Sequence, residues 1–146
     1  MWTNLITYKN GKKKRFHEAI EFFAIELFEK DVPNDLQIVV RFQELDNYGD
    51  SCILDYEDEF IIRINKNHDE ETQLRTLAHE MVHVKQYWKN ELRDAEGNYV
   101  IWHGCKLNAE NYEMDLPPWE VEAYEYEDRL LEKLGVNNGR YNKTQH

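Results

Sequence analysis

The stretch that decides the fold runs from Thr76 to Tyr87 and reads TLAHEMVHVKQY. On a helix, His79 and His83 are one turn apart, so both imidazoles project from the same face and can reach one metal ion. Glu80 lies one step further around the helix, where it can reach a water bound to that metal. The stretch therefore predicts a catalytic zinc (Zn2+) site on His79 and His83, with Glu80 as the general base of peptide-bond hydrolysis.

The residues around this stretch predict a helix from about Glu70 to Lys89, with Asn67 or Asp69 as its N-terminal cap. Its apolar residues fall on one stripe, and the two histidines lie on the opposite side together with two threonines. The apolar stripe is formed by Leu74, Leu77, Met81, Val84 and Trp88, and the threonines are Thr72 and Thr76. We expect the stripe to pack on the core and the histidines to face a cleft.

The rest of the chain predicts an α+β fold in a single domain over residues 1–146, with a flexible tail from about residue 137. Apolar periodicity indicates an N-terminal helix before the sheet and a C-terminal helix that Gly135 ends. We expect a small, mostly antiparallel sheet that includes a hairpin around an acidic turn. The expected helices are Arg15–Lys30 and Trp119–Leu134; the expected strands are Leu36–Phe42, Ser51–Tyr56 and Phe60–Asn65, with a short apolar segment at Tyr99–Trp102.

A catalytic zinc needs a third protein ligand, and three residues are candidates. Glu120 and Glu122 lie about 200° apart on the C-terminal helix, so only one of them can face the metal. Both flank the apolar stripe of that helix, which leaves the choice open, although the small Ala123 beside Glu122 allows a close helix approach. His103 is the third candidate. Three further acidic residues fit a solvated helix face: Glu125, Glu127 and Asp128.

Three separated segments resemble zincin metallopeptidases, and in particular the small metallopeptidase-like proteins common in bacteriophage genomes. These segments are Thr76–Tyr87, Trp102-x-Gly104 and Pro118–Tyr124, within roughly residues 60–130. The resemblance implies a minimal gluzincin, in which a glutamate on the following helix completes the zinc site. It favours Glu122 as the third ligand, beside His79 and His83.

A second resemblance points to a different ligand. His103-Gly104 is similar to the His-Gly that follows the metal helix in SprT-like proteases, where His103 would bind the zinc. The spacing differs, and the aromatic residue expected shortly after the glycine is absent. SprT-like enzymes also act on DNA-bound proteins, which fits poorly with the charge of this chain.

The composition restricts the partners. A net charge of −11, from 29 acidic and 18 basic residues, repels a phosphate backbone, so nucleic acid is not expected. The chain has neither a long apolar run nor a signal-peptide pattern, so we expect no membrane and a cytoplasmic location, in the host cytoplasm if a phage encodes it. The expected partner is a protein or peptide substrate. The rival function is a zinc-containing binding protein without catalysis.

Two further expectations concern the substrate. The strand before the metal helix, Phe60–Asn65, is the candidate for holding the substrate backbone by strand addition. A tyrosine or histidine near the cleft would stabilise the oxyanion, with His103, Tyr112 and Tyr124 as candidates.

Overall fold

The computed structural model describes residues 5–8, 13–53, 59–112 and 115–135. Helices and strands both contribute to it, which confirms the α+β class. The expected tail and most of the acidic turn lie outside the described residues. The elements are β1 (Leu5–Tyr8), α1 (Lys13–Leu27), β2 (Gln37–Gln43), β3 (Gly49–Ile53), β4 (Glu59–Asn65), α2 (Glu70–Trp88), β5 (Leu92–Asp94), β6 (Tyr99–Trp102), β7 (Cys105–Asn108), a 3₁₀ turn (Ala109–Tyr112) and α3 (Pro118–Leu134).

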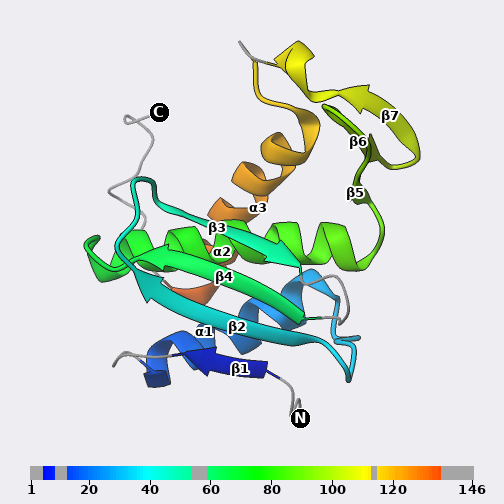
Figure 1. Cartoon of the computed structure of the whole chain (residues 1–146). Helices are drawn as coiled ribbons and strands as arrows, with labels where there is room; N and C mark the ends of the chain where they lie inside the picture. Colours follow the sequence, from blue (N-terminus) through cyan, green and yellow to red (C-terminus); the bar gives the residue numbers. More distant parts are fainter. Residues whose placement is uncertain (1–4, 9–12, 54–58, 113–114, 136–146) are drawn as a thin grey trace.

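The strands form two sheets rather than one (Figure 1). The larger sheet has the order β1-β2-β4-β3, and it is mixed because β2 runs parallel to both β1 and β4. The predicted hairpin pairing is confirmed, since β3 runs antiparallel to β4 with Ser51 opposite Ile62. A second, antiparallel sheet of β5, β6 and β7 was not expected. Antiparallel pairing therefore predominates over the described strands as expected, but the strands divide into two sheets, and the larger one is mixed.

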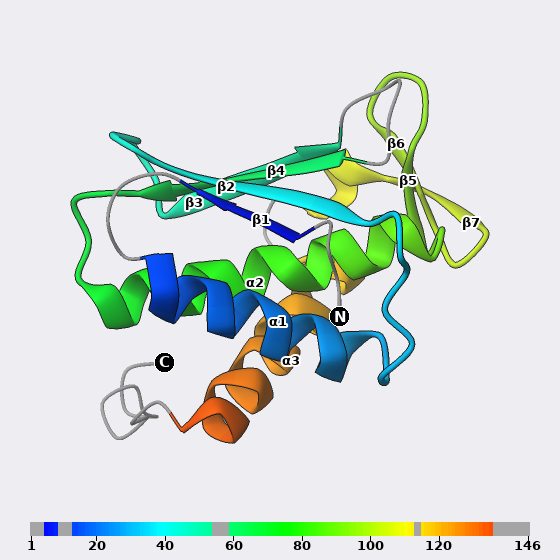
Figure 2. The ribbon, with the colours of Figure 1, turned by 90° about the horizontal axis from the view of Figure 1, so that it is seen from below.

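The helices lie on one side of the larger sheet. Helices α1 and α2 are next to the sheet, and α3 lies beyond them (Figure 2). Alternate residues of β2 and β4 are buried, as expected for strands with one face on a core. The central side chains of this core are Ile38, Val40, Ile62 and Ile64 from the sheet, Phe16, Ile20 and Phe23 from α1, and Leu74, Leu77 and Met81 from α2.

Helix α2 begins as predicted, because the Asp69 side chain accepts a hydrogen bond from the Thr72 amide at 2.8 Å. Its apolar stripe is buried except for Trp88, which is partly buried, and much of the opposite side is buried as well. The buried polar side chains include Gln73, Glu80, His83 and Gln86. Groups of this kind remain in an interior only when they have partners, and many of these partners come from α3.

Helix α3 starts at Pro118, where the missing amide hydrogen costs no helical bond, and it ends at Gly135, whose φ of +97° is left-handed. Ala123 is fully buried and permits close contact with α2. The two helices run antiparallel, since Arg75 of α2 meets Glu127 of α3 and His83 meets Glu120. Among the described helices, none combines the length and apolar character needed to cross a membrane.

Candidate metal centre

His79, His83 and Glu120 converge at the interface of α2 and α3. The Nε2 atom of His79 lies 3.0 Å from Glu120 Oε1, and the Nε2 atom of His83 lies 3.2 Å from Glu120 Oε2. The three residues, called the metal group below, offer ligand atoms that all lie within 4.8 Å of one another. The helical spacing of the two histidines therefore brings them together as the sequence predicted.

The third residue is not the predicted one. Glu122 Oε1 accepts a hydrogen bond from Gln86 Nε2 at 2.7 Å and lies 3.7 Å from Lys85 Nζ. It is on the other flank of α3, so the geometry favours Glu120 over Glu122 as the third ligand. Helical periodicity gives the separation of the two glutamates, but only the direction in which α3 crosses α2 decides which of them meets the histidines.

His103 is also not part of this group. It lies with Gly104 in the two-residue turn between β6 and β7, where both residues have positive φ, +49° and +83°. Its side chain is exposed and its ring contacts Trp102, with 4.3 Å between the ring centroids. Turn geometry therefore accounts for the His-Gly pair, because two-residue hairpin turns with positive φ favour glycine at the second position.

The Nδ1 nitrogen of each histidine, which does not face Glu120, has a hydrogen-bond partner of its own. His79 Nδ1 lies 2.8 Å from Glu127 Oε1, and His83 Nδ1 lies 2.8 Å from Gln86 Oε1. The Gln86 amide is oriented by its Nε2 group, which also donates to the Trp119 carbonyl at 3.1 Å. Because both partners of the histidines are oxygen acceptors, each Nδ1 carries hydrogen and donates it.

This arrangement fits a divalent cation. With hydrogen on both Nδ1 atoms, the neutral imidazoles of His79 and His83 direct the lone pairs of Nε2 toward the two oxygens of Glu120. Lone pairs that face one another need a proton or a cation between them. Two imidazoles and one carboxylate are also the nitrogen and oxygen ligands that zinc takes in catalytic sites.

Protons take this place when no metal is bound. Burial lowers the pKa of His79, but hydrogen bonds to Glu120 and Glu127 outweigh it and raise that pKa to about 10. Burial also lowers the pKa of His83, and its contact with Glu120 again raises it overall. For Glu120, burial raises the pKa, but the two histidines dominate and lower it to about 2. A metal ion must therefore displace protons from the histidines.

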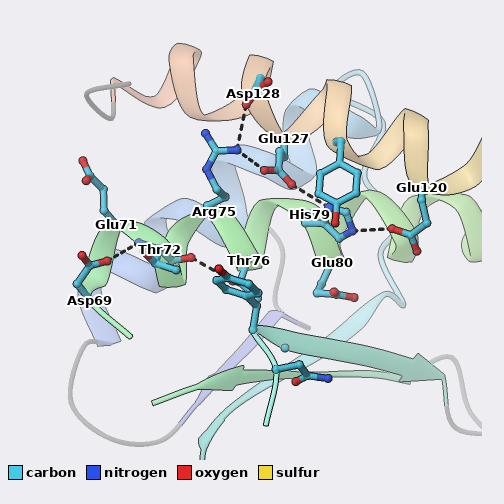
Figure 3. Close-up of a pocket in the computed structure, with 14 residues that line it drawn as sticks. Asp69, Glu71, Thr72, Arg75, Thr76, His79, Glu80, Glu120, Glu127 and Asp128 are labelled. Atoms are coloured by element: carbon cyan, nitrogen blue, oxygen red, sulfur yellow. Dashed lines mark hydrogen bonds and ion pairs between the residues drawn. The ribbon is translucent and has the colours of Figure 1, made fainter. Parts of the chain in front are cut away.

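Glu80 lies next to the metal group but is not one of the three converging residues. Figure 3 shows its side chain leaving α2 toward the sheet, away from α3. The Ser51 hydroxyl of β3 donates to Glu80 Oε1 at 2.7 Å. Burial raises the pKa of Glu80, although the two histidines and Ser51 counteract part of this effect. A carboxylate with a raised pKa beside a metal group is suited to accepting and returning a proton.

A cavity of about 980 Å³ opens beside these residues. Its walls come from α2, from α3 and from residues 47–49 at the start of β3. Gly49 allows β3 to approach α2, because a Cβ atom there would lie 2.6 Å from Thr76 Cγ2.

Of the three residues considered for the oxyanion, Tyr124 lines this cavity, and its ring centroid lies 4.5 Å from that of His79. Tyr112 instead packs against Trp119.

Sequence reasoning did not find four residues that support the site. Ser51 is distant in sequence and gave no signal, whereas Gln86 follows His83 by three positions and so shares its helix face. Glu127 was expected on a solvated face, but it is only 3% exposed, so that expectation is wrong. It follows Glu120 by seven positions, which also places the two on one face of α3. Arg75 binds the second oxygen of Glu127.

Comparisons with protein-family models, with curated proteins and with solved structures found no match to this chain. The function is therefore inferred from the chemistry of the site itself.

Proposed function

We propose that this protein is a zinc-dependent peptidase of the zincin type, a minimal gluzincin in which His79, His83 and Glu120 hold the metal. One observation carries the proposal: two imidazole nitrogens and a carboxylate from a neighbouring helix meet at one point, with the buried carboxyl of Glu80 alongside. A site for zinc alone has no use for a buried glutamate at that position. This glutamate favours catalysis over a zinc-containing binding protein.

Bound zinc would polarise the scissile carbonyl and make water acidic enough to react at neutral pH. The protein's own contribution to the reaction is proton transfer and positioning. Glu80 accepts the proton of the attacking water and passes it to the nitrogen of the leaving amine. The Ser51 hydroxyl holds Glu80 Oε1, which leaves the other carboxylate oxygen for the reaction. Glu127 and Gln86 keep the imidazoles of His79 and His83 oriented.

Tyr124 is the candidate for stabilising the oxyanion. It lines the cavity beside His79 and Glu120. Burial and the neighbouring carboxylates raise the pKa of its phenol, so the hydroxyl keeps its hydrogen at neutral pH and can donate it. Donors of this kind contribute most when they are already aimed at the place where charge develops.

Strand β3, rather than β4, is the candidate for holding the substrate. The sequence suggested Phe60–Asn65, but that strand is paired on both sides, with β2 and β3, so its backbone groups are already bonded. Strand β3 forms the edge of the larger sheet in the described part of the chain, and it carries Ser51 next to Glu80. An extended peptide could add to this edge and place its backbone beside the metal group.

The proposal is tested by zinc content together with hydrolysis of an unfolded protein. We expect one zinc per chain in protein purified without added metal, cleavage of the unfolded substrate, loss of cleavage on chelation and recovery with zinc. Zinc binding without cleavage of any unfolded protein or peptide library would support the binding-protein alternative. Failure to bind zinc would contradict both.

A further inference from the structure

Glu127 connects the metal group to a charge outside it. One carboxylate oxygen lies 2.8 Å from His79 Nδ1, and the other is bound by the guanidinium of Arg75 (Figure 3). Only 3% of Glu127 is exposed. A buried carboxylate needs such partners, because an unpaired charge in the interior is strongly unfavourable. Both oxygens of Glu127 are therefore committed to specific donors.

Arg75 can act only as a donor in this arrangement. Its guanidinium stays protonated at all ordinary pH values and has no acceptor atom. It lies one helical turn before His79 on α2, and it also contacts Asp128 Oδ1 at 3.0 Å. Since Arg75 donates to one oxygen of Glu127, the other oxygen is free to accept from His79 Nδ1. Once a metal displaces the proton between Nε2 of His79 and Glu120, the lone pair of Nε2 faces the metal.

We propose that Arg75 is a positioning residue that acts through Glu127 to keep hydrogen on Nδ1 of His79 and the lone pair of Nε2 in the metal group. The inference rests on the proposed metal site but does not require peptidase activity. The direct partner of His83 Nδ1 is instead the neutral amide of Gln86 rather than a carboxylate.

Replacing Glu127 by glutamine separates this role from simple packing. An amide has one accepting end and one donating end, and Arg75 can bind only the accepting end. The NH₂ group then turns to His79 Nδ1 and requires it to accept, which moves the hydrogen to Nε2. If the amide turns the other way, its NH₂ group faces the guanidinium, and the contact with Arg75 is lost.

The substitution Arg75→Met should therefore change zinc affinity in opposite directions in the wild-type protein and in the Glu127→Gln protein. In the wild-type protein, Arg75→Met should weaken zinc binding, because Glu127 loses the donor that orients it. In the Glu127→Gln protein, the same change should strengthen zinc binding, because the amide can then turn its oxygen to His79. A purely structural role of Arg75 would weaken binding in both backgrounds.

The test measures the zinc dissociation constants of the wild type, both single variants and the double variant by competition with a chromophoric chelator. We expect Glu127→Gln to weaken binding by about 10–100-fold, the usual cost of losing a partner of a ligand. Adding Arg75→Met should recover several-fold of this loss. Asp128→Asn is the matched control, since the exposed Asp128 also binds Arg75 but has no hydrogen bond or ion pair with His79 in the described structure, and it should change affinity by at most about fivefold.

A second measurement uses the wild type alone and so does not depend on whether a variant folds. Nitrogen-15 spectra of the zinc-loaded protein should show hydrogen on Nδ1 of His79. Hydrogen on Nε2, or further weakening when Arg75→Met is added to Glu127→Gln, would overturn the inference while leaving the zinc site intact. Absence of zinc binding by the wild type would overturn the proposed function and this inference with it.

Discussion

Glu120 and Glu122 are two positions apart in the first turns of α3, and their side chains are almost equally exposed, at 30% and 28%. Their neighbours differ completely. Glu120 meets the Nε2 atoms of both histidines, whereas Glu122 meets the amide of Gln86 and the ammonium of Lys85. Burial alone therefore does not distinguish a candidate metal ligand from a supporting residue in this protein.

The difference follows from the packing of two antiparallel helices. On one flank of α3, Glu120, Tyr124 and Glu127 all contact His79. On the other flank, Glu122 and Tyr126 approach Lys85. One flank thus serves the metal group, and the other holds the C-terminal half of α2 in place. The following predictions separate these roles.

The largest effect is expected at a third glutamate, which belongs to neither flank. Glu80→Gln should lower the rate of peptide hydrolysis by about 10²–10⁴-fold, because it removes the proton acceptor while keeping the shape. Its zinc affinity should stay close to that of the wild type, since Glu80 is not among the three converging ligands. Steady-state hydrolysis and zinc titration measure the two quantities. Cleavage at the wild-type rate would contradict the role of Glu80.

Matched alanine variants test whether Glu120 or Glu122 completes the zinc site. Glu120→Ala should weaken zinc binding by more than about 100-fold, because a ligand is lost. Glu122→Ala should weaken it by less than about tenfold, because Glu122 acts on His83 only through Gln86. Zinc titrations of the two proteins rank them directly. The reverse order would return the third ligand to Glu122.

Zinc affinity should rise with pH through the neutral range. The pKa of His79 is raised to about 10, so its Nε2 atom carries a proton near pH 7 when no metal is bound, and the pKa of His83 is also raised by Glu120. Zinc must displace this proton, and the cost falls as pH increases. The pKa of Glu120, about 2, keeps it ionised throughout, so it adds no slope. Dissociation constants measured from about pH 6 to 9 check this, and an affinity independent of pH would contradict it.

The smallest effect is expected for His103→Ala. The side chain is exposed in the β6–β7 turn, away from the metal group. Its removal should leave zinc affinity unchanged within error in the same titration. A large loss of zinc binding would instead favour the SprT-like arrangement.

Local patterns in the sequence predicted the parts of the site that depend on one element. The spacing of His79 and His83 and the N-terminal cap, for which Asn67 and Asp69 were the candidates, are properties of α2 alone; the structure agrees with the first and has Asp69 as the cap. The choice between Glu120 and Glu122 depends on how two helices cross, which periodicity does not contain. The Ser51 contact depends on the placement of β3 beside α2, so it also lay beyond local patterns.

The same distinction, between features of one element and contacts between elements, explains two predictions that differ from the structure. Glu127 looks like a surface residue within its acidic segment, but it is buried because Arg75 and His79 of the other helix bind its two oxygens. The second sheet was missed because its strands are three or four residues long, because β5 and β7 carry charged and other polar residues beside the apolar β6, and because a His-Gly turn is a weaker hairpin signal than Asn-Gly.

The most direct test of the central claim is a crystal structure of the zinc-loaded protein with anomalous scattering measured at the zinc edge. We expect one strong peak between α2 and α3, about 2.0–2.2 Å from Nε2 of His79, Nε2 of His83 and a carboxylate oxygen of Glu120. Glu122 should keep its hydrogen bond with Gln86. A peak bound by Glu122 or His103, or no peak beside the two histidines, would contradict the proposed zinc site.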